Sequence, residues 1–84
     1  MNKILVEILC PLTGRRYDFW LSKKLTVENA IEKLSFEIKN YENNPSLFAD
    51  NRDLVLFHES KFILDRKTTL YLAGVKSGDT LVLV

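Results

Sequence analysis

One helical stripe dominates the sequence and limits the folds that it can adopt. Between Thr26 and Tyr41, apolar side chains recur at three- and four-residue steps, the spacing of one face of an α-helix. The stripe consists of Val27, Ala30, Ile31, Leu34, Ile38 and Tyr41. Thr26 is expected to cap the helix, which should end near Asn40, before the turn-forming segment 43–46. Phe36 lies off the stripe and should face solvent or a neighbouring loop.

Segments on both sides of the helix alternate in the way that half-buried strands do. Lys3–Cys10 and Arg16–Leu21 should form a hairpin through a turn at 11–14. After the helix we expect three strands, Leu54–Phe57, Lys61–Leu64 and Thr80–Val84. An irregular connection over Leu47–Asp53 and a single helical turn over Thr69–Val75 should complete the chain. The prediction is an α+β fold, with one helix on one face of a mixed sheet.

Size and charge narrow the function classes. The 84 residues should form one domain, 1–84, because single cores commonly serve chains of this length. The 12 basic and 11 acidic residues leave a net charge of +1, and the basic ones are scattered, which argues against nucleic acid or an anionic membrane as the partner. No apolar run reaches the roughly 18 residues of a membrane span, so no membrane insertion is expected. With no second cysteine for a disulfide, the sequence predicts a cytoplasmic protein.

Few side chains offer catalytic or metal-binding chemistry. Cys10 and His58 are the only thiol and imidazole, and they lack the two further ligands that a tetrahedral zinc site needs. We expect Cys10 to be a small buried apolar residue and His58 to be exposed at a strand end. Gly14, Gly74 and Gly78 are too widely spaced for a phosphate-binding loop. The sequence therefore predicts no enzyme activity, no metal and no cofactor.

The order of these elements, together with several local motifs, resembles ubiquitin. The motifs are Leu12-Thr13-Gly14, Thr26-Val27-Glu28-Asn29, Leu64-Asp65 leading to Thr69-Leu70, and Thr80-Leu81-Val82-Leu83-Val84. The resemblance covers essentially the whole chain and implies a β-grasp fold with the strand order 2-1-5-3-4. The segment Gly74–Asp79 and the absence of a tail are more similar to the bacterial ubiquitin-like proteins of the YukD and EsaB type. Those proteins accompany Gram-positive type VII secretion systems.

The strands carry more apolar side chains than the helix-facing side of a sheet can use. The residues expected to face the helix are Ile4, Val6, Ile8, Tyr17, Phe19, Leu21, Leu54, Leu56, Leu81 and Leu83. The residues left for the opposite, outer face are Leu5, Leu9, Trp20, Val55, Phe57, Val82 and Val84. Ubiquitin binds partners through an apolar patch on this face, and Val55 and Val82 match it most directly. We therefore predict a protein-binding surface here, the alternative being that loops cover some of these residues or that they are merely strand formers tolerated outside.

Three functions are compatible with these observations. The first is a non-conjugated adaptor that binds a protein partner, such as a secretion-system component, or a second copy of itself through the outer face. The second is a modifier or sulfur carrier, but that chemistry needs a flexible Gly-Gly tail and this chain stops at Leu83-Val84. The third is a structural subunit of a larger assembly. The resemblance favours the adaptor.

Overall fold

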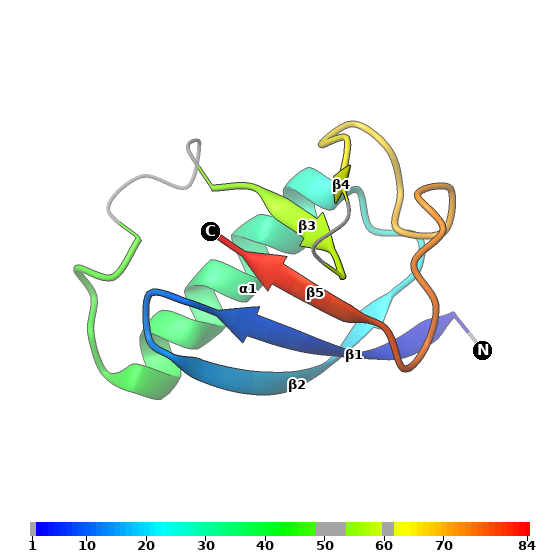
Figure 1. Ribbon diagram of the computed structural model, residues 1–84. Coiled ribbons are helices and arrows are strands. Elements are labelled where there is room, and N and C mark those ends of the chain that lie inside the picture. The colour runs from blue at the N-terminus through cyan, green and yellow to red at the C-terminus, as the bar shows by residue number, and fades with distance from the viewer. Residues whose placement is uncertain (1, 49–53, 60–61) are drawn as a thin grey trace.

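One long helix crosses one face of a mixed sheet of five strands (Figure 1). The computed structural model describes residues 2–48, 54–59 and 62–84. Its elements are β1 Lys3–Cys10, β2 Arg15–Ser22, α1 Val27–Glu42, β3 Leu56–His58, β4 Phe62–Ile63 and β5 Thr80–Leu83. The strand order is β2-β1-β5-β3-β4, and β5 pairs with β1 in parallel while the other pairs are antiparallel. The predicted α+β architecture and strand order are confirmed.

Both helix ends are capped by side-chain and backbone hydrogen bonds. The Thr26 hydroxyl accepts from the Asn29 N–H at 3.1 Å, as predicted. At the other end Asn43 adopts a left-handed conformation with φ 53°, and its N–H donates to the Asn40 carbonyl at 3.1 Å. The helix therefore continues to Glu42, beyond the predicted end near Asn40, and the cap residue Asn43 follows it directly.

The helical stripe packs on the sheet as predicted, with one exception. Val27, Ala30, Ile31, Leu34 and Ile38 are completely buried. Tyr41 is 72% exposed, because the last turn of α1 lies over the edge strand β2 rather than over the core. Its ring instead meets the ring of Tyr17 edge-on at 5.8 Å. Phe36 is 60% exposed and points to solvent, one of its two predicted directions.

The inward face of the sheet completes the core. Of the ten strand residues expected to face the helix, seven are buried and Ile4, Tyr17 and Phe19 are partly buried against the core. Cys10 is a free thiol with no exposed surface, as predicted. The alternation of side chains along the predicted strands therefore identifies correctly which strand residues face the helix.

Three shorter segments differ from the prediction or extend beyond the described residues. The third strand begins at Leu56 and includes His58, although Val55 and Val84 still exchange backbone hydrogen bonds of 2.7 and 3.1 Å. The predicted strand start at Lys61 and residues 49–53 of the predicted connection lie outside the described residues. By contrast, the segment 69–75 contains the predicted single helical turn, closed by an α-helical bond of 2.9 Å from the Ala73 N–H to the Thr69 carbonyl.

Among the described residues, no helix is both long enough and apolar enough to cross a bilayer.

Candidate binding surface on the outer sheet face

All seven predicted binding residues lie on the sheet face opposite α1. Strand pairing places Leu5 directly opposite Trp20, and Val82 directly opposite both Leu9 and Phe57. Directly paired residues point to the same side of a sheet. Val55 and Val84, which exchange backbone hydrogen bonds, form the next pair on this face.

An apolar row crosses four strands of this face. It consists of Leu9 on β1, Val82 on β5, Phe57 on β3 and Ile63 on β4, each paired with the next. With about 4.8 Å between neighbouring strands, the row is about 14 Å long. Ile63 is 58% exposed and was missed by the sequence prediction, because a strand of two residues shows no alternation from which to infer its face. The Val55–Val84 pair lies beside this row and extends it.

A polar band separates the apolar row from the other two predicted residues. On β1 the outer side chains run Leu5, Glu7, Leu9, and on β2 they run Trp20, Asp18, Arg16. The Glu7 carboxylate accepts from the Arg16 guanidinium at 3.0 Å and from the Thr80 hydroxyl at 3.1 Å. The structure therefore brings together Leu9, Val55, Phe57, Val82 and Val84, and leaves Leu5 and Trp20 as a separate apolar pair.

An apolar cavity of about 400 Å³ opens beside the Val55–Val84 pair. It is lined by Pro11, Leu12, Phe48, Leu54, Leu83 and Val84. Val84 belongs both to this cavity and to the pair beside the row. Leu12, at the tip of the β1–β2 turn, is mostly exposed and adds a further apolar side chain at this end.

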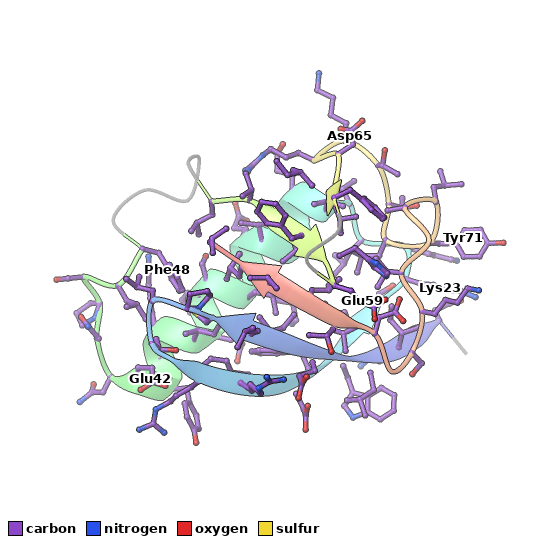
Figure 2. All side chains as sticks on the ribbon, in the orientation of Figure 1. Lys23, Glu42, Phe48, Glu59, Asp65 and Tyr71 are labelled. Atoms are coloured by element: carbon purple, nitrogen blue, oxygen red, sulfur yellow. The ribbon has the colours of Figure 1, made fainter. Side chains whose placement is uncertain are left out.

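A second exposed apolar spot lies at the opposite end of the molecule, in the turn that follows residue 69. Tyr71 and Leu72 are both largely exposed, and Figure 2 shows the Tyr71 ring pointing away from the protein above Lys23. The Lys23 ammonium lies 5.2 Å from the centre of that ring, within the range of a cation–π contact. The sequence prediction missed this spot because it treated the segment as a helical turn without a surface role.

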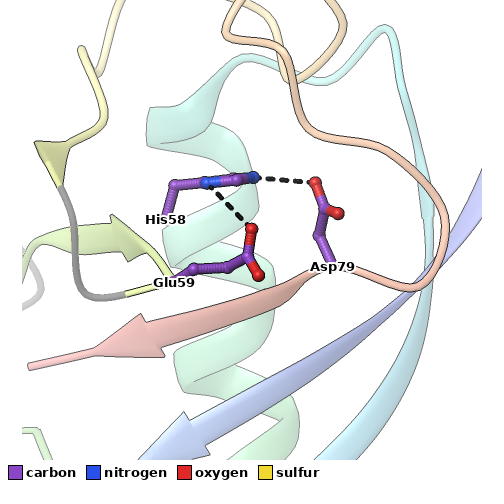
Figure 3. A group of neighbouring side chains, drawn as sticks. All are labelled: His58, Glu59 and Asp79. Atoms are coloured by element: carbon purple, nitrogen blue, oxygen red, sulfur yellow. Dashed lines mark hydrogen bonds and ion pairs between the residues drawn. The ribbon is translucent and has the colours of Figure 1, made fainter.

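His58 is held between two carboxylates at the β3–β5 corner (Figure 3). Its Nε2 lies 2.7 Å from Asp79 Oδ2, and its Nδ1 lies 3.6 Å from Glu59 Oε2. The imidazole also stacks on the Phe62 ring at 5.4 Å. The prediction of an exposed histidine is wrong: its side chain is only 14% exposed, because Phe62 and the loop carrying Asp79 cover the ring.

The geometry of this cluster favours hydrogen bonding over metal binding. The two carboxylates face different nitrogens of one imidazole ring, as Figure 3 shows. Among the described residues, one ligand atom from each of His58, Glu59 and Asp79 lies within 4.8 Å of the others, so the cluster offers three ligand residues, one fewer than a structural zinc site has. We interpret the cluster as a clamp that joins the end of β3 to the start of β5.

The pKa of Asp79 gives this clamp a pH dependence. Burial raises the pKa of the carboxyl, but the hydrogen bonds from His58 and from the Lys76 N–H, 2.8 Å long, outweigh burial and hold the pKa below its usual value. Because the folded state has the lower pKa, the carboxylate stabilises the fold above its unfolded-state pKa. That contribution is lost as the pH falls through the folded-state value.

Asp79→Asn should reduce the free energy of unfolding at pH 7 by about 1 to 2 kcal/mol, because it removes charged hydrogen bonds that are largely shielded from water. The difference from the wild-type protein should shrink as the pH falls from about 5 towards 2. Urea unfolding at a series of pH values measures it. A difference that stays constant over that range would contradict the role given to the Asp79 charge.

The topology, with one helix on one face of a five-stranded mixed sheet, defines a ubiquitin-like β-grasp fold. The ubiquitin-like domain of the Mycobacterium tuberculosis type VII secretion system protein EccD1 is similar to it, with a TM-score of 0.74 and 26% identity over 100% of this chain and 99% of that one. The corresponding domain of Plasmodium falciparum Dsk2 has a TM-score of 0.74 and 21% identity, over 98% of this chain and 96% of that one. The ubiquitin-like domain of the Arabidopsis thaliana protein At2g32350 has a TM-score of 0.72 and 21% identity, over 100% and 78%. No protein-family model matches the chain, and no curated protein does.

Proposed function

We propose that this chain is a non-conjugated ubiquitin-like adaptor, a single domain without enzymatic activity that binds a protein partner through its outer sheet face. The observation that carries the proposal is the apolar row Leu9–Val82–Phe57–Ile63, extended by the Val55–Val84 pair. These side chains lie on the face that the helix leaves uncovered. Contiguous apolar patches of this kind on a small protein commonly mark interaction sites.

The partner that we propose is a component of a type VII secretion system, bound on the cytoplasmic side. The similarity to the EccD1 ubiquitin-like domain, which spans the full length of this chain, supports this context. The resemblance of the sequence to the YukD and EsaB type of protein supports the same context independently of the structure. Leu5 and Trp20, beyond the polar band, are proposed as a secondary contact for a partner that extends across the sheet.

The proposal predicts that a charge in the apolar row abolishes partner capture. Val82 is paired on both sides within the row and points away from the core, so Val82→Glu should weaken binding by well over 1 kcal/mol, about tenfold or more, without unfolding the chain. The matched control is Phe36→Glu, which places the same charge on an exposed aromatic position of the helix.

The wild-type protein and both variants are used as affinity baits with lysate from a bacterium that contains a type VII secretion system, and circular dichroism confirms that each bait is folded. Phe36→Glu should retain the secretion component that the wild-type protein retains, and Val82→Glu should lose it. Equal retention by both variants would contradict the proposed surface. Retention of no secretion component by the wild-type protein would contradict the proposed context.

A further inference from the structure

Strand β2 has an open edge. It lies at one side of the sheet (Figure 1) and pairs with β1 along its whole length, Arg15 to Ser22. In the part of the chain that the structure describes, no strand pairs with its other side. The strand contains no proline and its register with β1 is continuous, so it lacks two features that commonly protect an edge from pairing.

The hydrogen bonds of β1 show which backbone groups of β2 are open. Glu7 donates its N–H to the Asp79 carbonyl at 3.0 Å, and the Leu5 carbonyl accepts from the Gly78 N–H at 2.7 Å, so these residues of β1 bond towards β5. Their neighbours on β1 therefore bond towards β2, to the residues with inward side chains. The backbone groups at Arg16, Asp18 and Trp20, whose side chains lie on the outer face, consequently point out of the open edge.

The outer side chains at this edge carry an unbalanced charge pattern. Asp18 lies directly opposite Glu7, and like charges opposite each other destabilise a strand pair. Glu7 is neutralised by Arg16, at 3.0 Å, whereas Asp18 has no ion pair among the described residues. A cation on a chain that pairs with the open edge would neutralise Asp18. Arg16 is the cationic residue among the outer side chains of this edge.

We propose that the β2 edge binds the β2 edge of a second copy of this chain, antiparallel and centred on Tyr17. In this register Arg16 of each copy lies directly opposite Asp18 of the other, which makes two symmetric ion pairs. Arg16 and Asp18 are also residues whose backbone groups point out of the edge, so the same register forms the new hydrogen-bond ladder. The two sheets join into one continuous sheet, and the interface is the same patch on both copies.

Charge selects this register over its neighbours. Centring the pair on Asp18 would place two Asp18 carboxylates opposite each other, which is repulsive. Centring it on Phe19 would place Asp18 of each copy opposite Trp20 of the other and leave the two Asp18 carboxylates unpaired. Only the register centred on Tyr17 among these three pairs Arg16 with Asp18.

The helix side of the edge has room for a side chain of the second copy. A cavity of about 290 Å³ runs there, lined by Arg16, Tyr17, Asp18, Phe19, Glu37 and Tyr41. In the proposed register Arg15 of the second copy falls opposite Phe19, with its side chain on the helix side. Glu37 and the aromatic rings in this cavity suit a guanidinium group electrostatically.

Sedimentation equilibrium over a concentration series tests the proposal by charge exchange. The wild-type protein should show a monomer–dimer equilibrium, and R16D and D18R should each weaken the dimer by about tenfold or more, because each variant places like charges opposite each other twice. An equimolar mixture of the two single variants should form heterodimers of wild-type affinity, since every cross-copy pair again joins opposite charges. Circular dichroism confirms that each variant is folded.

The Val82→Glu variant distinguishes dimerisation through the β2 edge from the binding of a different partner through the apolar row. It should leave the dimer unchanged, because Val82 lies on β5, away from the β2 edge. A wild-type chain that stays monomeric at every concentration would overturn the proposal and leave the edge to an extended segment of another protein. A dimer that is insensitive to both charge variants, or that is lost in Val82→Glu, would overturn it equally.

Discussion

Leu81→Glu will prevent the protein from folding, whereas the same substitution at the next residue, Val82, will leave the fold intact. Leu81 has no exposed surface and lies in the core beneath α1. A carboxylate buried there in the apolar core costs more than about 4 kcal/mol, a large part of the 5 to 15 kcal/mol that stabilises a typical domain. Val82 points to the opposite face, where a charge remains hydrated.

Far-UV circular dichroism and urea unfolding of the two variants measure this contrast. Leu81→Glu should show the spectrum of an unfolded chain, and Val82→Glu should unfold at a urea concentration close to that of the wild-type protein. The reverse result would mean that the side chains of β5 face the opposite way from those described here.

Leu34→Ala should lower the free energy of unfolding by about 2 to 5 kcal/mol, because it removes buried methyl groups and leaves a cavity. Leu34 is completely buried at the centre of the helical stripe. Phe36→Ala is the matched control on the same helix, and it should change the stability by less than about 0.5 kcal/mol because the Phe36 ring is exposed. A Leu34→Ala midpoint in urea within error of the wild-type value would show that the stripe does not form the core.

The elements predicted well are those with several periods of a repeating pattern. The helix repeats its stripe over four turns, so its buried face and its start at Thr26 follow from spacing and capping alone. The strand Lys3–Cys10 repeats its alternation over eight residues, which determines the inward and outward faces. Because β5 pairs in register with β1, the faces of β1 also determine that Leu81 points inward and Val82 outward.

The predictions that failed or were displaced concern single positions decided by a local cap or by tertiary contacts. The helix continues past Asn40 because Asn43 is the cap residue, in a left-handed conformation. A segment rich in turn-forming residues predicts the position of a helix end only to within a few residues. His58 is covered because Phe62 and Asp79, distant in sequence, meet over its ring. Tyr41 follows the stripe but projects over the sheet edge, where periodicity carries no information about what lies opposite.

The sequence predicts on which face of the sheet the candidate site lies, but not which residues of that face lie together. Alternation places Leu9, Phe57 and Val82 on the outer side, and pairing between distant strands then assembles them into one row. The same pairing inserts Glu7 and its partners between this row and Trp20, which no local pattern indicates. Ile63 joins the row only because Phe57 lies opposite it.

Isothermal titration calorimetry with the purified secretion component captured by the wild-type bait tests the central claim most directly. The protein should bind this component at least about ten times more tightly than Val82→Glu does, while Phe36→Glu should bind as tightly as the wild-type protein. Equal affinities for the wild-type protein and a folded Val82→Glu would contradict the claim that the outer sheet face binds the partner.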